Sequence, residues 1–188
     1  EEACPHNLAP TSTTTCMLAL GDALALSVME ARGFTPDDYA LFHPAGALGR
    51  RLLLRVGDVM RTGDGLAIVP EPTTLRDAMF AITRAKAGAA CVVDPDGRMV
   101  GLLTDGDIRR RILEDEANLR KPVSSAMTRG PHTVTPDMLA AEGLHLFETR
   151  QTVVEGTARR VGDIPVVDEA GRPVGMLMLK DLLQAGLV

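Results

Sequence analysis

Residues 100–107 read VGLLTDGD, and residues 174–181, 74 positions further on, read VGMLMLKD. A Val-Val-Asp triplet and a glycine precede each stretch, at positions 92–94 and 97 in the first copy and 166–168 and 171 in the second. A repeat of this length is a folded unit, and two copies pack together because neither buries its apolar surface alone. The sequence therefore predicts two similar units that lie face to face.

Each copy is expected to contain the elements β-α-β-β-α behind a short helix, which gives an α/β (α+β) fold class. The first copy, 55–120, has helices at 56–60, 75–87 and 105–116 and strands at 67–69, 90–93 and 99–103. The second copy, 121–188, repeats this order at 124–127, 133–135, 137–148, 164–167, 174–178 and after 179. About ten additional residues fall in the polar stretch 151–162, which we expect to be a mobile loop.

Composition excludes several classes of protein. The 188 residues are 45% hydrophobic and 24% charged, as in an ordinary globular domain. A net charge of −5 has the wrong sign for a nucleic-acid binder. No apolar run approaches the roughly 18 residues of a membrane span. Cys4, Cys16 and Cys91 are scattered, which predicts no disulfide and no metal site and suits a reducing cytoplasm.

Residues 1–54 form a different region. The hydroxyl run at 11–15 offers caps for a helix at about 13–32, and Gly33 follows as a stop signal. This helix is apolar around much of its circumference, so it should be buried, yet nothing in the following 30 residues is large enough to cover it. Because the chain begins at Glu1 without methionine, we expect a fragment of a longer protein.

The repeat carrying Gly101, Thr104 and Asp107 resembles a CBS domain, and residues 55–188 resemble a CBS pair. The resemblance implies a nucleotide-type ligand in a cleft between the repeats. Thr104 ends a strand and Asp107 lies in the next helical turn, where a carboxylate accepts hydrogen bonds from a ribose diol. Alternatively, the two residues only cap the helix. The arginines at 109–111 balance phosphate charge or form an exposed helix face.

The second copy departs from this pattern. Asp181 matches Asp107, but Met178 replaces the threonine and offers no hydroxyl group. We therefore expect one competent ligand site, at the first copy. The second cleft, with Asp181 as its ligand-binding candidate, is either empty or binds something else.

Residues 7–54, ending in the motif HPAGALGR at 43–50, resemble the end of the sugar-isomerase (SIS) domain of D-arabinose-5-phosphate isomerases. Members of that family carry a CBS pair directly behind the SIS domain. The resemblance implies interconversion of ribulose 5-phosphate and arabinose 5-phosphate for lipopolysaccharide synthesis, without a cofactor. His43 matches the family's active-site histidine. Thr11, Ser12 and Thr13 either face the sugar phosphate at a helix N-terminus or cap that helix.

The family's phosphate loop and its acidic and lysine active-site residues are expected upstream of Glu1, so we predict that this chain alone has no isomerase activity. The chain would then consist of a SIS remnant (1–54) and two CBS domains (55–120 and 121–188). It would be a cytoplasmic homo-oligomer with sugar-phosphate and nucleotide or nucleotide-sugar ligands, and without nucleic-acid or membrane partners. A stand-alone nucleotide-sensing module and an oligomerisation scaffold remain the alternatives.

Overall fold

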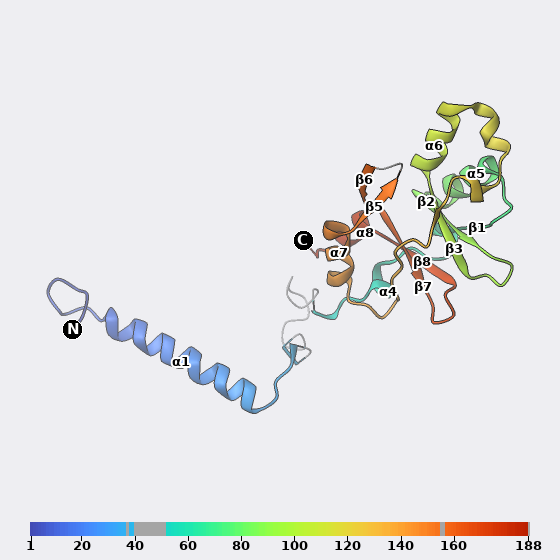
Figure 1. Cartoon of the computed structure of the whole chain (residues 1–188). Helices are drawn as coiled ribbons and strands as arrows, with labels where there is room; N and C mark the ends of the chain where they lie inside the picture. The colour runs from blue at the N-terminus through green and yellow to red at the C-terminus, as the bar shows by residue number, and fades with distance from the viewer. Residues whose placement is uncertain (37, 40–51, 155–156, 188) are drawn as a thin grey trace. The chain divides into compact units, whose positions relative to one another are not determined.

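The structure is a computed structural model that describes residues 1–36, 38–39, 52–154 and 157–187 (Figure 1). Contacts divide the chain into two compact units, Glu1–Pro44 and Ala45–Val188, and each is considered by itself. The predicted catalytic His43 lies outside the described residues.

The first unit is dominated by one helix, α1 (Ser12–Ala31). It ends at Ala31 with Arg32 as its C-cap, and Gly33 follows in the left-handed conformation with φ +63°, so the expected helix is confirmed. The expected burial is not found, because no residue of α1 is buried and Met17, Leu18 and Leu20 are each more than 60% exposed.

The same helix corrects the expectation that no stretch approaches a membrane span. Within the described residues, α1 is the one helix whose length and composition would allow it to cross a membrane, with a mean hydropathy of 1.3. Asp22 and Gly21 interrupt the apolar run in the sequence, but the mean hydropathy of the helix stays high despite them. A core helix of a soluble domain has the same composition, so this property does not place the helix in a lipid bilayer.

The first repeat contains a four-stranded sheet in the order β1-β2-β3-β4. β1 pairs parallel with β2, and the remaining neighbours are antiparallel. Helix α5 begins at its cap Thr74, whose hydroxyl accepts the Asp77 amide hydrogen bond at 3.1 Å. The elements are α4 (Val56–Val59), η1 (Gly63–Gly65), β1 (Ala67–Pro70), α5 (Leu75–Ala85), β2 (Ala89–Val93), β3 (Met99–Thr104), α6 (Asp105–Glu114), η2 (Glu116–Arg120), η3 (Val123–Ser125) and β4 (Thr128–Arg129).

The second repeat is built around the antiparallel pair β7 and β8. Val134 forms a parallel bridge to Val166, so the strand expected at 133–135 is reduced to one bridge. The helix expected from 137 begins three residues later. The elements are α7 (Ala140–Thr149), β5 (Gln151–Val154), β6 (Thr157–Arg160), β7 (Asp163–Val167), β8 (Pro173–Met178) and α8 (Leu179–Gln184).

The prediction of a mobile loop at 151–162 is wrong. β5 and β6 pair antiparallel in this stretch, from Gln151 with Arg160 to Val154 with Thr157. The β-branched residues in these strands favour an extended backbone, and their polar neighbours do not prevent strand pairing.

The two repeats exchange the short segments that precede them. Val56 of α4 is fully buried in the core of the second repeat, whereas Val123 of η3 is fully buried in the core of the first. Backbone hydrogen bonds also join each segment to the opposite repeat. The Val56 N–H donates to the Met138 carbonyl oxygen at 2.9 Å, and the Val123 N–H donates to the Thr73 carbonyl oxygen at 2.8 Å. Hydrophobic contacts therefore cross the domain boundary expected between residues 120 and 121. The position of that boundary stays a prediction.

The methionine at the end of each exchanged segment packs against a glycine of the other repeat. Met60 lies against Gly175 in β8, and Met127 lies against Gly101 in β3. The backbones of Arg61 and Met176 then pair in both directions, with N–H to O distances of 2.9 and 3.0 Å. The glycine shared by the two repeat motifs thus makes room for the methionine of the segment that crosses over.

A third apolar cluster lies where the two sheets meet. Its buried residues come from both repeats: Ala89, Cys91, Leu102, Met176 and Met178. Burial raises the pKa of the Cys91 thiol to about 12, so this thiol stays protonated at neutral pH.

We predict that Gly175→Ala destabilises the second unit. A Cβ at residue 175 would lie 2.9 Å from Met60 Cγ and 3.1 Å from the Arg61 carbonyl oxygen. The crowded site should lower the free energy of unfolding by about 1–3 kcal/mol, which corresponds to a drop of roughly 3–8 °C in Tm. Thermal unfolding followed by circular dichroism measures the change.

Gly162→Ala is the matched control, because no atom lies within 4 Å of its added Cβ. If Gly175→Ala melts at the same temperature as this control, the close approach of Met60 does not hold the repeats together.

Candidate functional site

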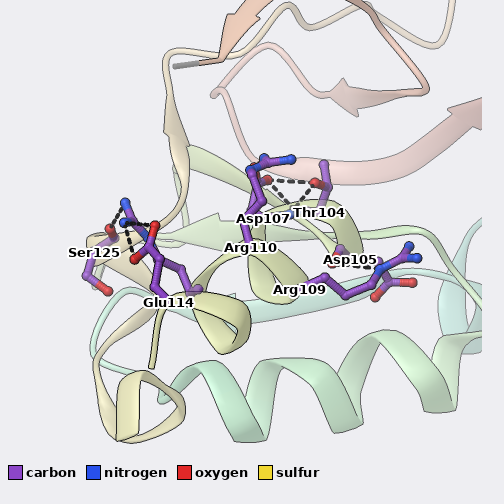
Figure 2. Close-up of polar contacts among 8 residues, drawn as sticks. Thr104, Asp105, Asp107, Arg109, Arg110, Glu114 and Ser125 are labelled. Carbon is purple, nitrogen blue, oxygen red and sulfur yellow. Dashed lines mark hydrogen bonds and ion pairs between the residues drawn. The ribbon is translucent and has the colours of Figure 1, made fainter. Parts of the chain in front are cut away.

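Thr104 and Asp107 are joined at the start of α6 (Figure 2). The Asp107 carboxylate oxygen Oδ2 accepts from the Thr104 amide at 2.9 Å and from its hydroxyl at 2.6 Å. In return, Thr104 Oγ1 accepts from the Asp107 amide at 3.2 Å. The pair is a reciprocal capping box, so the structure shows the capping role and brings both predicted ligand-binding residues together.

The second oxygen of Asp107, Oδ1, is engaged by the Arg110 guanidinium one turn along α6. Asp107 is only 7% exposed, and the Arg110 side chain is half-buried. A carboxylate has about four lone-pair directions, and the Thr104 and Arg110 contacts use three of them. A ligand hydroxyl at Asp107 would therefore share this carboxylate with Arg110 or displace that side chain.

The other two arginines of α6 have different surroundings (Figure 2). Arg109 is exposed, and its Nε donates to the Asp105 carbonyl oxygen at 3.4 Å. Arg111 pairs with Glu114 at 3.0 Å and donates to the Ser125 carbonyl oxygen at 3.2 Å. Arg109 therefore lies on an exposed helix face, as one of the two alternatives predicted. Arg111 instead connects α6 to η3 through its hydrogen bond to Ser125.

At the corresponding position of the second repeat, Asp181 has a partner from the first repeat. Arg61 Nε lies 2.7 Å from Asp181 Oδ2, and Arg61 Nη2 lies 3.1 Å from Oδ1. Arg61 Nη1 also donates to the Lys86 carbonyl oxygen at 3.1 Å. The Asp181 carboxylate raises the pKa of Arg61 through its hydrogen bond. The two carboxylates of the repeat motif therefore have unlike partners, one local and one across the repeats.

A third carboxylate, Asp163, lies close to this pair. Burial raises its pKa, and the charges of Asp105 and Asp181 raise it further, whereas those of Lys180 and Arg61 lower it. Gly88 leaves room for the group, because a Cβ there would lie 2.6 Å from Asp163 Oδ2. Negative charge is thus concentrated around Asp181, and Arg61 neutralises part of it.

In the first unit, Glu2 occupies the N-terminus of α1. Its Oε2 accepts from the Thr11 amide at 2.6 Å and from the Thr13 amide at 3.3 Å, while the Thr13 hydroxyl bonds Oε1. These hydrogen bonds, led by that of the Thr13 side chain, lower the pKa of Glu2 to about 2. Thr11 makes no side-chain capping bond, so the helix is capped by Glu2 and not by the hydroxyl run.

Ser12 is half-buried beside Thr11 at the same helix end. The structure therefore places Thr11, Ser12 and Thr13 together, and their contact with substrate stays a prediction. Sequence reasoning missed Arg61, which acts on a residue 120 positions away in the chain, and Glu2, which lies outside the helix that it caps. Among the described residues no cluster of three or more potential ligating side chains could hold a metal ion.

The repeat geometry agrees with the comparison to protein families. The chain matches the CBS domain family over residues 56–114 and 123–187, and it belongs to that family. The expectation of a tandem CBS pair is therefore confirmed.

Curated relatives are similar along the whole chain, and two of them serve as examples. Arabinose 5-phosphate isomerase KdsD from Pseudomonas aeruginosa is 46% identical over 188 residues, covering 100% of this chain and 55% of that protein. The protein of the same name from Escherichia coli K12 is 42% identical over 189 residues, covering 100% of this chain and 54% of that protein. The chain thus spans about half the length of the curated relatives it matches.

Solved structures show the same fold. CBSX2 in complex with AMP is 25% identical, with a TM-score of 0.57 over 71% of this chain and 96% of that one. An uncharacterized conserved protein from Pyrococcus horikoshii is 27% identical, with a TM-score of 0.56 over 70% of this chain and 91% of that one.

We predict that Asp163→Asn stabilises the protein at pH 7 but not at pH 3. A raised pKa means that the folded state binds more protons than the unfolded state, so stability falls as pH rises from about 3.8 through the folded pKa. The amide has no proton to lose and avoids this cost, which should raise Tm at pH 7.

Thermal unfolding at both pH values measures the difference between variant and parent. Asp96→Asn, in the exposed turn after β2, is the control and should change Tm at neither pH. An equal Tm of Asp163→Asn and the parent at pH 7 would show that burial of this carboxylate carries no cost.

Proposed function

We propose that this chain is the regulatory CBS pair and adjoining SIS segment of an arabinose 5-phosphate isomerase. The observation that supports this most strongly is the 46% identity that extends over all 188 residues, including those before the CBS repeats. A CBS pair attached to another kind of protein would match such a relative only over the repeats. The whole protein is then a sugar-phosphate isomerase located in the cytoplasm as a homo-oligomer.

The reaction interconverts an aldose and a ketose phosphate, in which a proton moves between C1 and C2 through an enediol. This chemistry needs an acid, a base and a partner for the developing oxyanion, and it requires no cofactor. His43 would supply one of the proton-transfer groups, because an imidazole titrates near neutral pH. Thr11, Ser12 and Thr13 would contribute to phosphate binding at the start of α1, where the phosphate would displace the Glu2 carboxylate from the Thr11 and Thr13 donors.

The isomerase activity is expected to be absent from the 188-residue chain by itself. The chain spans 55% of its Pseudomonas relative, and the family's remaining active-site groups are expected in the other part. A coupled assay that reduces or derivatises the product measures turnover from arabinose 5-phosphate. Turnover above the buffer rate by the purified chain would contradict this assignment.

For the CBS pair, we infer that the ligand is a nucleotide or nucleotide sugar held at Thr104 and Asp107. The related CBSX2 structure contains AMP, which supports this class of ligand. A ribose diol would take the Oδ1 side of Asp107, which Arg110 now occupies. Arg110 would then be free to pair with the ligand phosphate, so one exchange of partners satisfies both charges.

The first repeat is favoured over the second as the nucleotide site because the residues around the motif carboxylate differ between the two repeats. Thr104 offers a hydroxyl next to Asp107, whereas Met178 offers none next to Asp181. Asp181 is also held through both oxygens by Arg61. One ligand per chain at the first repeat is therefore the expected stoichiometry for a nucleotide.

Isothermal titration calorimetry with AMP tests this site. Asp107→Ala should weaken AMP binding by at least about tenfold, since it removes the acceptor for the ribose hydroxyls and leaves them unpaired. Asp96→Ala removes the same charge from the exposed turn after β2 and should leave the affinity unchanged.

If AMP binds Asp107→Ala as tightly as the parent chain, the placement of the site is wrong. If neither AMP nor a nucleotide sugar changes the Tm of the parent chain, the CBS pair is an oligomerisation scaffold and not a sensor.

A further inference from the structure

Met60 and Met127 occupy matching places at the ends of the two exchanged segments, but they differ in exposure. Met127 is 9% exposed and belongs to the buried core of the first repeat. Met60 is half-buried, as one of the residues that pack against the core of the second repeat. A half-buried thioether is open to chemical attack from solvent, whereas a buried one is shielded. The two equivalent methionines therefore differ in their susceptibility to oxidation.

The Met60 sulfur lies against the backbone of β8. A Cβ built on Gly175 would have Met60 Sδ as its nearest neighbour and Met60 Cγ at 2.9 Å. The thioether thus occupies the space that a side chain at residue 175 would need. Because protein interiors are close-packed, this side of the sulfur has no room for a further atom. An oxygen added to the sulfur has to push the side chain away from Gly175.

The backbone N–H groups beside Met60 already have acceptors. The Met60 N–H donates to the Val56 carbonyl oxygen at 2.8 Å. The Arg61 N–H donates to the Met176 carbonyl oxygen at 2.9 Å, and the Met176 N–H donates back to Arg61 at 3.0 Å. A sulfoxide oxygen turned toward Gly175 would gain none of these donors, and a polar atom without a partner at a packed contact is destabilising.

We propose that Met60 is an oxidation site whose sulfoxide separates the lead segment of the first repeat from β8. The oxidant is a peroxide. A sulfur lone pair attacks one peroxide oxygen, so the S–O bond forms as the O–O bond breaks. The sulfur loses two electrons, the peroxide gains them, and the leaving oxygen takes the hydroxyl proton and departs as water or an alcohol. Methionine sulfoxide reductases restore the thioether, so the modification is reversible.

The position of Arg61 makes this modification consequential. Arg61 follows Met60 directly, its backbone pairs with Met176, and its side chain pairs with Asp181 of the second repeat. Displacement of Met60 therefore loosens three contacts between the repeats at once. Oxidation of an exposed methionine, such as Met17 on α1 at 66% exposure, has no comparable contact to break.

Dilute hydrogen peroxide on the folded chain is the probe, and peptide mass spectrometry follows each methionine. Met60 should form its sulfoxide at least about fivefold faster than Met127, because Met127 is shielded. Oxidation of Met60 should lower Tm by about 3 °C or more. Hydrogen exchange at the Arg61 and Met176 amides should become faster by about tenfold or more, since these amides lose their pairing.

Two leucine variants separate Met60 from the other methionines. Met60→Leu removes the sulfur and keeps an apolar side chain of similar volume, so peroxide should lower its Tm by less than about half as much as in the parent. Met17→Leu is the matched control, because it removes an exposed sulfur and should leave the full peroxide-induced fall in Tm.

Two further measurements do not depend on the stability of Met60→Leu. Met60→Gln places a polar group at the same position and should reproduce the fall in Tm without peroxide. Treatment of the oxidised parent with methionine sulfoxide reductases should restore Tm and the slow exchange of the Arg61 amide together.

Three results would overturn the inference. Met60 could stay reduced while Met127 is oxidised, which would show that its sulfur is shielded. The parent could keep its Tm after complete oxidation of Met60, which would show that the contact with Gly175 tolerates the added oxygen. Equal falls in Tm for the parent and Met60→Leu under peroxide would assign the effect to other methionines.

Discussion

The insertion of Met60 against Gly175 and of Met127 against Gly101 is the packing constraint on which the rest of the second unit depends. Each methionine arrives on a segment that begins one repeat and completes the core of the other, through Val56 and Val123. Neither repeat has a finished core without the segment of its partner. This arrangement fixes the positions of the two repeat motifs relative to each other and so defines the surroundings of both carboxylates.

The two carboxylates show how one motif acquires two uses. Asp107 is held by contacts within its own helix turn, to Thr104 and Arg110, and these form as soon as α6 forms. Asp181 depends on Arg61, which is 120 positions away in the chain and reaches it because the first repeat's lead segment crosses over. Exchange of the lead segments thus makes one site local and the other a connection between repeats.

Much of the fold was predictable because its signals are local. The hairpin β2–β3 follows from its apolar strands and its Pro-Gly turn, and α5 follows from the Thr74 cap and the apolar spacing at Leu75, Ala78 and Ile82. The capping box was likewise readable from two residues, Thr104 and Asp107. The features that sequence reasoning missed are mostly contacts between distant segments, namely the crossed lead segments and the Arg61–Asp181 pair, together with the Glu2 carboxylate at the start of α1. The β5–β6 hairpin was missed for another reason: its strands lie in a polar stretch, and the few β-branched residues in them are a weak signal for a strand.

Native-state hydrogen exchange of the strand amides in β3 and β8 tests the central claim most directly. If the crossed segments make the two repeats interdependent, the slowest amides of both strands exchange through one global opening with the same free energy. Gly175→Ala should then lower the protection of β3 as much as that of β8. Two distinct opening free energies, with the loss confined to β8 in the variant, would contradict the account.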